Sequence, residues 1–443
     1  MLRHAHFTLF HSGGRAAGFI DTDTLTPKQI YADNAIPGEE AEVELLRRLR
    51  GFRQGVVHQL IKPSPDRVTP FCPHATICGG CNWQHITYPA QLHWKREILV
   101  NALTKYDIVT PPVPEVIPSP LLQGYRNKSE YACLPVLGFH QRDHNKTVFA
   151  CDVCFLQPPH VHQVAKMIAQ RGAFRSLQIR TTTLGDTFCI LGLSQPDHAL
   201  FERLKVEIPY INGWYYAIDN DIVHFGGAMH LEESVDTLRF RYSPLSFYQP
   251  NPLQAVAIYR KILAYAELTG RETVYDLYTG IGTIACMVAL YAKQVIGIEG
   301  NPQAILDAKH NALLNNIHNT QFITGDILKM FTTGFVNSHP KADVIILDPP
   351  RSGTLTEIKK AIIHAAPQKI VYVSCNPVSL AWDLKQLCAG GYRVTALQPF
   401  DMFPHTHHIE TVCLLTAQET EHNSGHYRTA DGAGYGGAHS VHQ

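Results

Sequence analysis

Helix-like and strand-like segments alternate along the C-terminal part of the chain, and this order limits the possible folds more than any other feature. From about Pro244 the helical stretches are YRKILAYAEL, GTIACMVALYA and AILDAKHNALLNN, and the buried strands are TVYDLY, QVIGIEG, DVIILD and KIVYVSC. Regular alternation of this kind is typical of a parallel sheet with helices on both faces. The sequence therefore predicts an α/β, doubly wound, Rossmann-like domain over residues 241–418.

Three other segments differ in pattern. Residues 1–62 carry short apolar runs between turn signals such as Gly13-Gly14 and Pro37-Gly38, which predicts a small β-barrel of the oligonucleotide-binding kind. Residues 63–240 mix strand-like runs (LQIRTTTL and TFCILGL) with a helical stretch near 160–171, which predicts a central α+β domain. Residues 419–443 are rich in His and Gly and poor in apolar residues, so we expect a disordered tail.

Composition excludes several classes of protein. Of the 443 residues 45% are hydrophobic, as in an ordinary globular protein, which rules out a disordered chaperone-like chain. No apolar run approaches the roughly 18 residues of a membrane span. The start, MLRHAHFTLF, lacks a secretory signal. The eleven cysteines are therefore expected to be reduced thiols of a cytoplasmic protein.

Net charge argues against a nucleic-acid partner at first sight, because 38 basic residues balance 38 acidic ones. The distribution is uneven, however. Between Leu45 and Arg67 lie six basic residues and one acid: Arg47, Arg48, Arg50, Arg53, Lys62, Arg67 and Asp66. This stretch could face phosphates or could be a solvated strand face, and the sequence leaves both open.

A glycine loop follows the first strand of the C-terminal domain. Gly280-x-Gly282 stands between a strand and a helix, and Glu299 ends the next strand about twenty residues on, where a carboxylate can accept hydrogen bonds from both ribose hydroxyls. The missing third glycine and the acidic Asp276 disfavour a pyrophosphate and favour a cationic, phosphate-free cofactor. S-adenosylmethionine meets that requirement, whereas a glycine turn made only for packing is the plain alternative.

Two further strand ends carry motifs, and the first of them, Asp-Pro-Pro, resembles the motif of S-adenosylmethionine-dependent nucleic-acid methyltransferases, which implies chemistry on a base such as a pyrimidine. Asp348-Pro349-Pro350 follows one strand, and Cys375 follows the next within Ser-Cys-Asn-Pro. Carbon 5 of a pyrimidine is a poor nucleophile unless a thiolate first adds to carbon 6, and a base must later remove the carbon 5 proton. Glu410 is a candidate for that base. The alternatives are an inert buried thiol and a surface carboxylate.

Five cysteines form a ligand-like pattern. Cys72-x5-Cys78-x2-Cys81 places three thiols in one turn-rich loop, and Cys151-x2-Cys154 follows about seventy residues later. From spacing alone a structural zinc is the default and an iron–sulfur cluster the alternative.

Together, DLYTGIGTIA, LDPPRSG, SCNP and FPHTHHIETV resemble the RNA uracil-C5 methyltransferase family over residues 5–416. The resemblance implies S-adenosyl-L-methionine as cofactor, Cys375 as nucleophile and Glu410 as proton acceptor. It also implies a cofactor site lined by Gln249 (in the Phe-x-Gln-x-Asn stretch), Tyr278, Glu299, Asp326 and Asp348. Thr283 departs from the family, in which several members have asparagine there.

The cysteine pattern resembles the [4Fe-4S] site of the ribosomal-RNA branch of that family. This implies Cys72, Cys78, Cys81 and Cys154 as ligands, with Cys151 in reserve, and an N-terminal TRAM domain that binds RNA. We therefore expect a monomeric enzyme that makes 5-methyluridine in 23S ribosomal RNA. A transfer-RNA enzyme and a non-catalytic RNA-binding zinc-ribbon protein remain alternatives.

Overall fold

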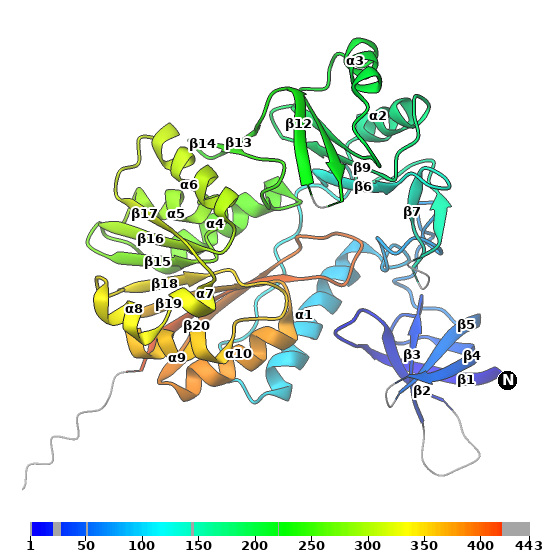
Figure 1. Ribbon diagram of the computed structural model, residues 1–443. Helices are drawn as coiled ribbons and strands as arrows, with labels where there is room; N and C mark the ends of the chain where they lie inside the picture. The colour runs from blue at the N-terminus through cyan, green and yellow to red at the C-terminus, as the bar shows by residue number, and fades with distance from the viewer. Residues whose placement is uncertain (1, 21–27, 50–51, 143–145, 220, 419–443) are drawn as a thin grey trace, which may run out of the picture.

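The structure is a computed structural model that describes residues 2–20, 28–49, 52–142, 146–219 and 221–418. The predicted tail and the side chains of Arg47, Arg48 and Arg50 lie outside the described part. Figure 1 shows three parts: a small barrel at the N-terminus, a central sheet, and a larger C-terminal sheet between two layers of helices. None of the described helices is both long and apolar enough to cross a membrane.

The N-terminal part is a closed barrel, as the sequence predicted. Its strands follow the order β1-β2-β3-β5-β4. Their bounds are β1 Leu2–Phe10, β2 Ala16–Ile20, β3 Lys28–Asp33, β4 Glu40–Leu49 and β5 Phe52–Lys62. Alternating apolar residues such as Ala5, Phe7 and Ile30 fill the interior, and Trp83, from the cysteine segment that follows, also belongs to this core.

The central part is a seven-stranded sheet with the order β12-β11-β10-β9-β6-β7-β8. Its strands are β6 Lys128–Ala132, β7 Gly138–His140, β8 Val148–Ala150, β9 Ser176–Thr181, β10 Thr187–Gly192, β11 Gly213–Ile218 and β12 Asp221–Gly227. Helices α2 (Pro159–Ala169) and α3 (His198–Glu207) share one apolar cluster with the sheet. The α+β class and the helix predicted near residue 160 are both confirmed.

The C-terminal part contains a second seven-stranded sheet, with the order β17-β16-β15-β18-β19-β21-β20. Five strands are parallel, and β21 and β20 complete the sheet as antiparallel strands. The bounds are β15 Thr273–Leu277, β16 Gln294–Glu299, β17 Thr320–Thr324, β18 Val344–Leu347, β19 Lys369–Ser374, β20 Tyr392–Phe400 and β21 Glu410–Ala417. The order reverses between β15 and β18, and doubly wound sheets bind ligands at such a point.

Helices cover both faces of this sheet, as the strand–helix alternation predicted. Alternate residues of β15 point to opposite cores: Val274 to the core with α4, α5 and α6, and Tyr275 to the core with α9 and α10. The helix bounds are α4 Pro252–Ala266, α5 Thr283–Ala289, α6 Pro302–Leu314, α7 Ile327–Met330, α8 Thr333–Ser338, α9 Thr356–Ala365 and α10 Pro377–Ala389.

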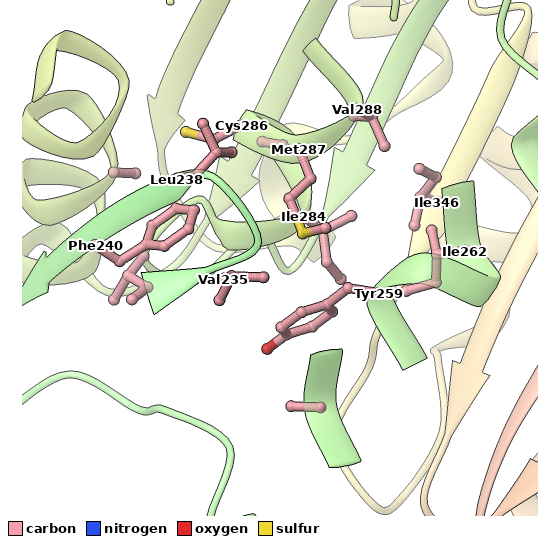
Figure 2. Close-up of a cluster of buried hydrophobic side chains, with 14 of the residues drawn as sticks. Val235, Leu238, Phe240, Tyr259, Ile262, Ile284, Cys286, Met287, Val288 and Ile346 are labelled. Atoms are coloured by element: carbon pink, nitrogen blue, oxygen red, sulfur yellow. The ribbon is translucent and has the colours of Figure 1, made fainter. Parts of the chain in front are cut away.

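Two segments depart from the predicted division of the chain. Helix α1 (Tyr88–Lys105) packs against α10, and its Leu99 and Leu103 join the C-terminal core. The hairpin of β13 (Leu231–Val235) and β14 (Leu238–Tyr242) packs against α6, and Figure 2 shows its Phe240 in one cluster with Cys286 of α5. The sequence placed both segments in a unit over 63–240, but their apolar faces complete the cores of the C-terminal sheet instead.

Candidate active site

A cavity of about 710 Å³ opens at the carboxyl edge of the C-terminal sheet. Six of the seven predicted catalytic and cofactor-site residues line it: Gln249, Tyr278, Glu299, Asp348, Cys375 and Glu410. The seventh, Asp326, lines an adjoining cavity of about 400 Å³ that shares Tyr278 and Glu299 with the first. We call the larger one the catalytic cavity.

Strand register brings Cys375 and Glu410 together. Ser374 at the end of β19 pairs with Thr411 of β21. Because the two strands run in opposite directions, Cys375, which follows Ser374, comes opposite Glu410, which precedes Thr411. Residues opposite each other in an antiparallel pair are neighbours, with Cα atoms about 4.5–5.5 Å apart. The predicted nucleophile and the predicted base, which are far apart in the sequence, thus meet at one edge.

Electrostatics in the catalytic cavity couple these two groups. Burial, together with the negative charges of Glu410 and Asp348, raises the pKa of Cys375 to about 12, and Arg351 acts in the opposite direction. Burial and the Asp348 carboxylate also raise the pKa of Glu410 well above its ordinary value. The ionisation of Glu410 therefore depends on what occupies the cavity.

The glycine loop closes one side of the catalytic cavity and is held by Glu299. Glu299 accepts the backbone N–H of Gly280 (3.1 Å) through one carboxylate oxygen and that of Asn301 (2.8 Å) through the other. Gly282 has φ +80°, and a Cβ there would lie 2.9 Å from Cβ of Ala308, so close packing as well as the turn requires glycine.

Asp276 has a different role from the one predicted. It is 1% exposed and lies beneath the loop, where its carboxylate accepts the hydroxyl of Thr279 at 2.5 Å. Burial raises the pKa of Asp276 to about 7. The residue therefore shapes the loop from inside the protein, and a direct repulsion of phosphate in the cavity is not its function.

Tyr278 is supported by a buried ionic network. Its hydroxyl lies 3.0 Å from the hydroxyl of Thr354, whose backbone N–H donates to Asp383 at 2.8 Å. Asp383 also accepts the hydroxyl of Tyr372 (2.6 Å) and forms an ion pair with Lys359, in which both side chains are 3% exposed. Sequence patterns gave no sign of this network, because its members lie on different elements.

Further residues line the catalytic cavity beyond those predicted for the site. Phe247 is 68% exposed there, beside Gln249 of the same Phe-x-Gln stretch. Other contributors are Gly79, Gly80, Arg126, Arg351, Phe403, Thr406 and His408. Phe247 and His408 stand inside motifs already recognised, whereas nothing in the sequence places Gly79 and Gly80, from the cysteine loop, beside the end of β19.

All five cysteines of the predicted ligand pattern line a second cavity, of about 380 Å³, which we call the cysteine cavity. Gly79, Gly80 and Arg126 line both cavities, so this part of the chain forms a shared wall. Burial raises the pKa of Cys81 and of Cys151 to about 12, as expected for buried thiols without a counter-charge.

The sulfur atoms differ in their backbone contacts. Cys78 accepts the N–H of Gly80 at 3.4 Å, and the N–H of Leu156 lowers the pKa of Cys154 by hydrogen bonding, against the larger effect of burial. Cys151 has an N–H contact with Val153 as well, but its sulfur also lies 3.3 Å from the Val153 carbonyl oxygen. A thiol can donate to that oxygen and a metal-bound thiolate cannot, which favours Cys154 as the fourth ligand.

The distance between ligand sulfur atoms differs between a zinc site and an iron–sulfur cluster. A tetrahedral zinc with Zn–S bonds of about 2.3 Å holds its sulfurs about 3.8 Å apart. Among the described His, Cys, Asp and Glu side chains, the trio with ligand atoms all within 4.8 Å is His4, His6 and Glu40 on the barrel, and no three cysteines meet that spacing.

The basic stretch of the barrel is partly structural. Arg67 makes two hydrogen bonds of 2.6 Å to the carboxylate of Glu39, which is 1% exposed, so it holds the barrel to the next segment and is not free to bind phosphate. Arg53 and Lys62 remain exposed, although Lys62 lies 3.8 Å from Glu40.

Comparisons with known proteins agree with this geometry. Residues 227–418 match the family described as tRNA (Uracil-5-)-methyltransferase. An uncharacterized RNA methyltransferase of Porphyromonas gingivalis is 38% identical over 440 residues, which cover 87% of this chain and 95% of the relative. One from Bacteroides thetaiotaomicron is 37% identical, over 87% of this chain and 96% of the relative.

A solved structure resembles the whole chain. The Pyrococcus abyssi tRNA (uracil-54, C5)-methyltransferase, in complex with S-adenosyl-L-homocysteine, superposes with a TM-score of 0.74 and 27% identity. The match covers 93% of this chain and 99% of that one. The barrel, the central sheet and the C-terminal sheet thus have counterparts in one solved protein.

Proposed function

The chain belongs to the RNA uracil-C5 methyltransferase family, and from that premise we propose that it methylates carbon 5 of a specific uridine through a covalent adduct with Cys375. It is an S-adenosylmethionine-dependent RNA methyltransferase. The observation that carries the covalent mechanism is the strand register that sets Cys375 and Glu410 side by side in one cavity.

The catalytic cavity fits S-adenosyl-L-methionine, which when bound supplies an electrophilic methyl group on a sulfonium. Its lining is acidic, with Glu299 and Asp348 in the cavity and Asp326 in the adjoining one, as a cationic ligand without phosphate requires. Glu299 is held by two backbone N–H groups and can accept the ribose hydroxyls with its remaining lone pairs. We assign Gln249 and Tyr278 to contacts with the same ligand.

Cys375 starts the reaction as a thiolate. Its sulfur forms a bond to carbon 6 of the uracil, and the electron pair of the carbon 5–carbon 6 double bond moves into the ring carbonyl as an enolate. Carbon 5 then carries the electron density needed to accept a methyl group. Arg351 favours the thiolate, because it opposes the effect of burial on the pKa of Cys375. The target base must leave its stack to reach this position.

Glu410 completes the reaction as a general base. It takes the proton from carbon 5, the electrons of that C–H bond restore the carbon 5–carbon 6 double bond, and the sulfur of Cys375 departs with the electrons of the C–S bond. A carboxylate with a raised pKa suits this role because it is a stronger base than an exposed one.

We further propose that the cysteine cavity holds a [4Fe-4S] cluster on Cys72, Cys78, Cys81 and Cys154. The cavity that all five cysteines line and the backbone N–H contacts to their sulfurs support this assignment. Methyl transfer consumes no electrons, so the cluster has a structural role. Arg142 also stabilises the cysteine loop, because its guanidinium donates to the carbonyl oxygens of Ala75 (2.9 Å) and Cys81 (2.7 Å).

We propose 23S ribosomal RNA as the substrate and transfer RNA as the second candidate. The cysteine pattern, through its resemblance to the ribosomal-RNA branch, supports the first. The similarity to the Pyrococcus abyssi tRNA (uracil-54, C5)-methyltransferase favours the second. Mapping 5-methyluridine in ribosomal and transfer RNA of a strain that lacks this gene decides between them. Loss of one 23S site is expected, loss of a transfer-RNA site supports the second candidate, and an unchanged pattern in both RNAs contradicts both.

A further inference from the structure

The loop between β20 and β21, residues 401–409, sets the position of the proposed base. We call it the base loop. It leads directly into Glu410, and its Phe403, Thr406 and His408 line the catalytic cavity. A shift of this loop therefore moves Glu410 relative to carbon 5 of a bound uracil.

The first half of the base loop is anchored by α1. The ammonium of Lys95 donates to the Asp401 carboxylate (2.5 Å) and to the Phe403 carbonyl oxygen (3.0 Å), and both ionic side chains are fully buried. The Gln91 side-chain oxygen accepts the backbone N–H of His405 at 2.9 Å.

The second half is held by Asn82, which directly follows Cys81. Its side-chain oxygen accepts the backbone N–H of His407 (3.2 Å), its side-chain nitrogen lies 2.8 Å from Nδ1 of His407, and its backbone N–H donates to the His405 carbonyl oxygen (3.2 Å). Because the Asn82 side-chain oxygen accepts the hydrogen bond from the His407 backbone, the Asn82 side-chain nitrogen is the atom that donates to the His407 ring. Nδ1 of His407 is then the acceptor, and the ring is neutral with its proton on Nε2. One amide thus fixes both the backbone and the ring of His407.

The barrel meets the same point from the other side. Gly14 has φ +81°, and a Cβ there would lie 2.5 Å from Cγ of His407 and 2.6 Å from Nδ2 of Asn82. The indole N–H of Trp83 donates to the Gly14 carbonyl oxygen at 2.9 Å. Close packing therefore joins three segments at this point: the barrel turn, the end of the cysteine segment and the base loop.

We propose that Asn82 is a positioning residue for Glu410, and that the cysteine segment thereby controls the release of the methylated uridine from Cys375. The inference rests on the proposed function, since it requires Glu410 to be the base. Asn82 touches no reacting atom. Its loss leaves addition of Cys375 intact and slows proton removal, so the covalent complex with ordinary uridine RNA accumulates.

The experiment compares the purified cluster-loaded protein with Asn82→Ala, Asn82→Asp and the control Ile77→Ala. Ile77 lies in the same cysteine loop and is 40% exposed, and its backbone hydrogen bonds are made with His74 and Arg142, outside the base loop. Four readouts are taken: iron content, kcat, KM, and the fraction of RNA held in a covalent complex on a denaturing gel. The first arm is the wild-type protein with 5-fluorouridine RNA. Failure to form a complex there contradicts the proposed function and says nothing against Asn82.

Given that complex, Asn82→Ala is expected to retain iron, to lose on the order of tenfold to a hundredfold in kcat with a parallel fall in KM, and to accumulate a complex with uridine RNA. Asn82→Asp should recover part of the kcat, because its carboxylate can pair with a protonated His407. The proposal is overturned if Asn82→Ala turns over as fast as Ile77→Ala, or if its kcat falls without accumulation of the covalent complex. If Asn82→Ala does not fold, Gly14→Ala decides. Its Cβ displaces the side chains of both His407 and Asn82, so accumulation of the covalent complex supports the proposal and wild-type turnover overturns it.

Discussion

Cys375 and Glu410 lie opposite each other, one residue beyond the Ser374–Thr411 pair that joins β19 to β21. The antiparallel insertion of β21 next to the last parallel strand produces this arrangement, because the start of β21 is thereby brought to the carboxyl edge of β19. The two groups also influence each other, since the Glu410 charge raises the pKa of the Cys375 thiol.

Glu410→Gln should therefore make Cys375 more reactive toward iodoacetamide. The pKa of Cys375 is raised to about 12, so the thiolate is disfavoured below that pH, and removing a nearby negative charge lowers the pKa. The pH profile of alkylation shifts to lower pH, most clearly where Glu410 is ionised in the wild type. Mass spectrometry of the Cys375 peptide measures the profile. Glu357→Gln, at an exposed position of α9, is the control, and identical profiles for all three proteins would contradict the coupling.

Glu299→Gln should weaken the binding of S-adenosyl-L-methionine by about tenfold or more, because a hydrogen bond to a charged group contributes about 1.5–3 kcal/mol. The amide can also accept only through its oxygen, so one of the contacts to Gly280 and Asn301 is lost. Isothermal titration calorimetry with S-adenosyl-L-homocysteine gives the affinity. An unchanged Kd would place the ribose elsewhere.

Lys359→Met should destabilise the C-terminal sheet by about 3–5 kcal/mol, because it leaves the Asp383 carboxylate buried without a counter-charge. Urea unfolding followed by circular dichroism measures the loss. Lys385→Met, on α10, is the control. Its contact with Asp107 is 4.0 Å long and exposed, and such pairs contribute less than about 1 kcal/mol. Equal losses in the two variants would contradict the account of the buried network.

Cys154→Ser should remove most of the iron from protein purified under nitrogen, whereas Cys151→Ser should retain it. The Val153 carbonyl contact is the reason, because it fits a protonated thiol at Cys151. Iron assay and visible absorbance distinguish the variants, and elemental analysis for zinc tests the competing metal. Iron loss in Cys151→Ser alone would reverse the assignment, and zinc in place of iron would contradict the cluster itself.

Sequence patterns predicted those features that depend on local order. Strands such as TVYDL are entirely buried and alternate with helices, so the parallel sheet could be inferred, and with it the shared edge where Glu299, Asp348 and Cys375 stand. Each residue that ends a parallel strand faces the same edge, whatever the intervening distance. The site residues were accessible to sequence reasoning for this reason.

Features that depend on packing between distant segments could not be predicted. Lysine is almost never fully buried without a partner, yet Lys95 is fully buried, and its partner Asp401 lies 306 residues away in the sequence. The pattern likewise gave no sign that Asp276 lies beneath its loop, or that Gly79 and Gly80 line the catalytic cavity. These contacts depend on the direction of side chains and on how the parts of the fold pack against one another, and a short stretch of sequence specifies neither.

The net charge of zero does not exclude an RNA partner, because acidic and basic residues gather in different parts of the structure. The acidic residues Glu299, Asp326 and Asp348 line the proposed cofactor site, while Arg126 and Lys128 line the cysteine cavity. Binding of RNA should accordingly depend on salt only modestly, with shape and the displaced base carrying much of the recognition. Filter binding between low and moderate salt measures the slope. A loss as steep as that of a strongly basic RNA-binding protein would contradict this expectation.

Covalent catalysis by Cys375 is the central claim, and RNA carrying 5-fluorouridine tests it most directly. The fluorine at carbon 5 cannot be removed as a proton, so Glu410 cannot release the methylated adduct. With S-adenosyl-L-methionine present, the wild-type protein should form a complex that survives denaturing electrophoresis and yields a Cys375 peptide linked to the modified nucleotide. Cys375→Ala should form none. A complex of equal yield in Cys375→Ala, or none in the wild type with ribosomal or transfer RNA, would contradict the account.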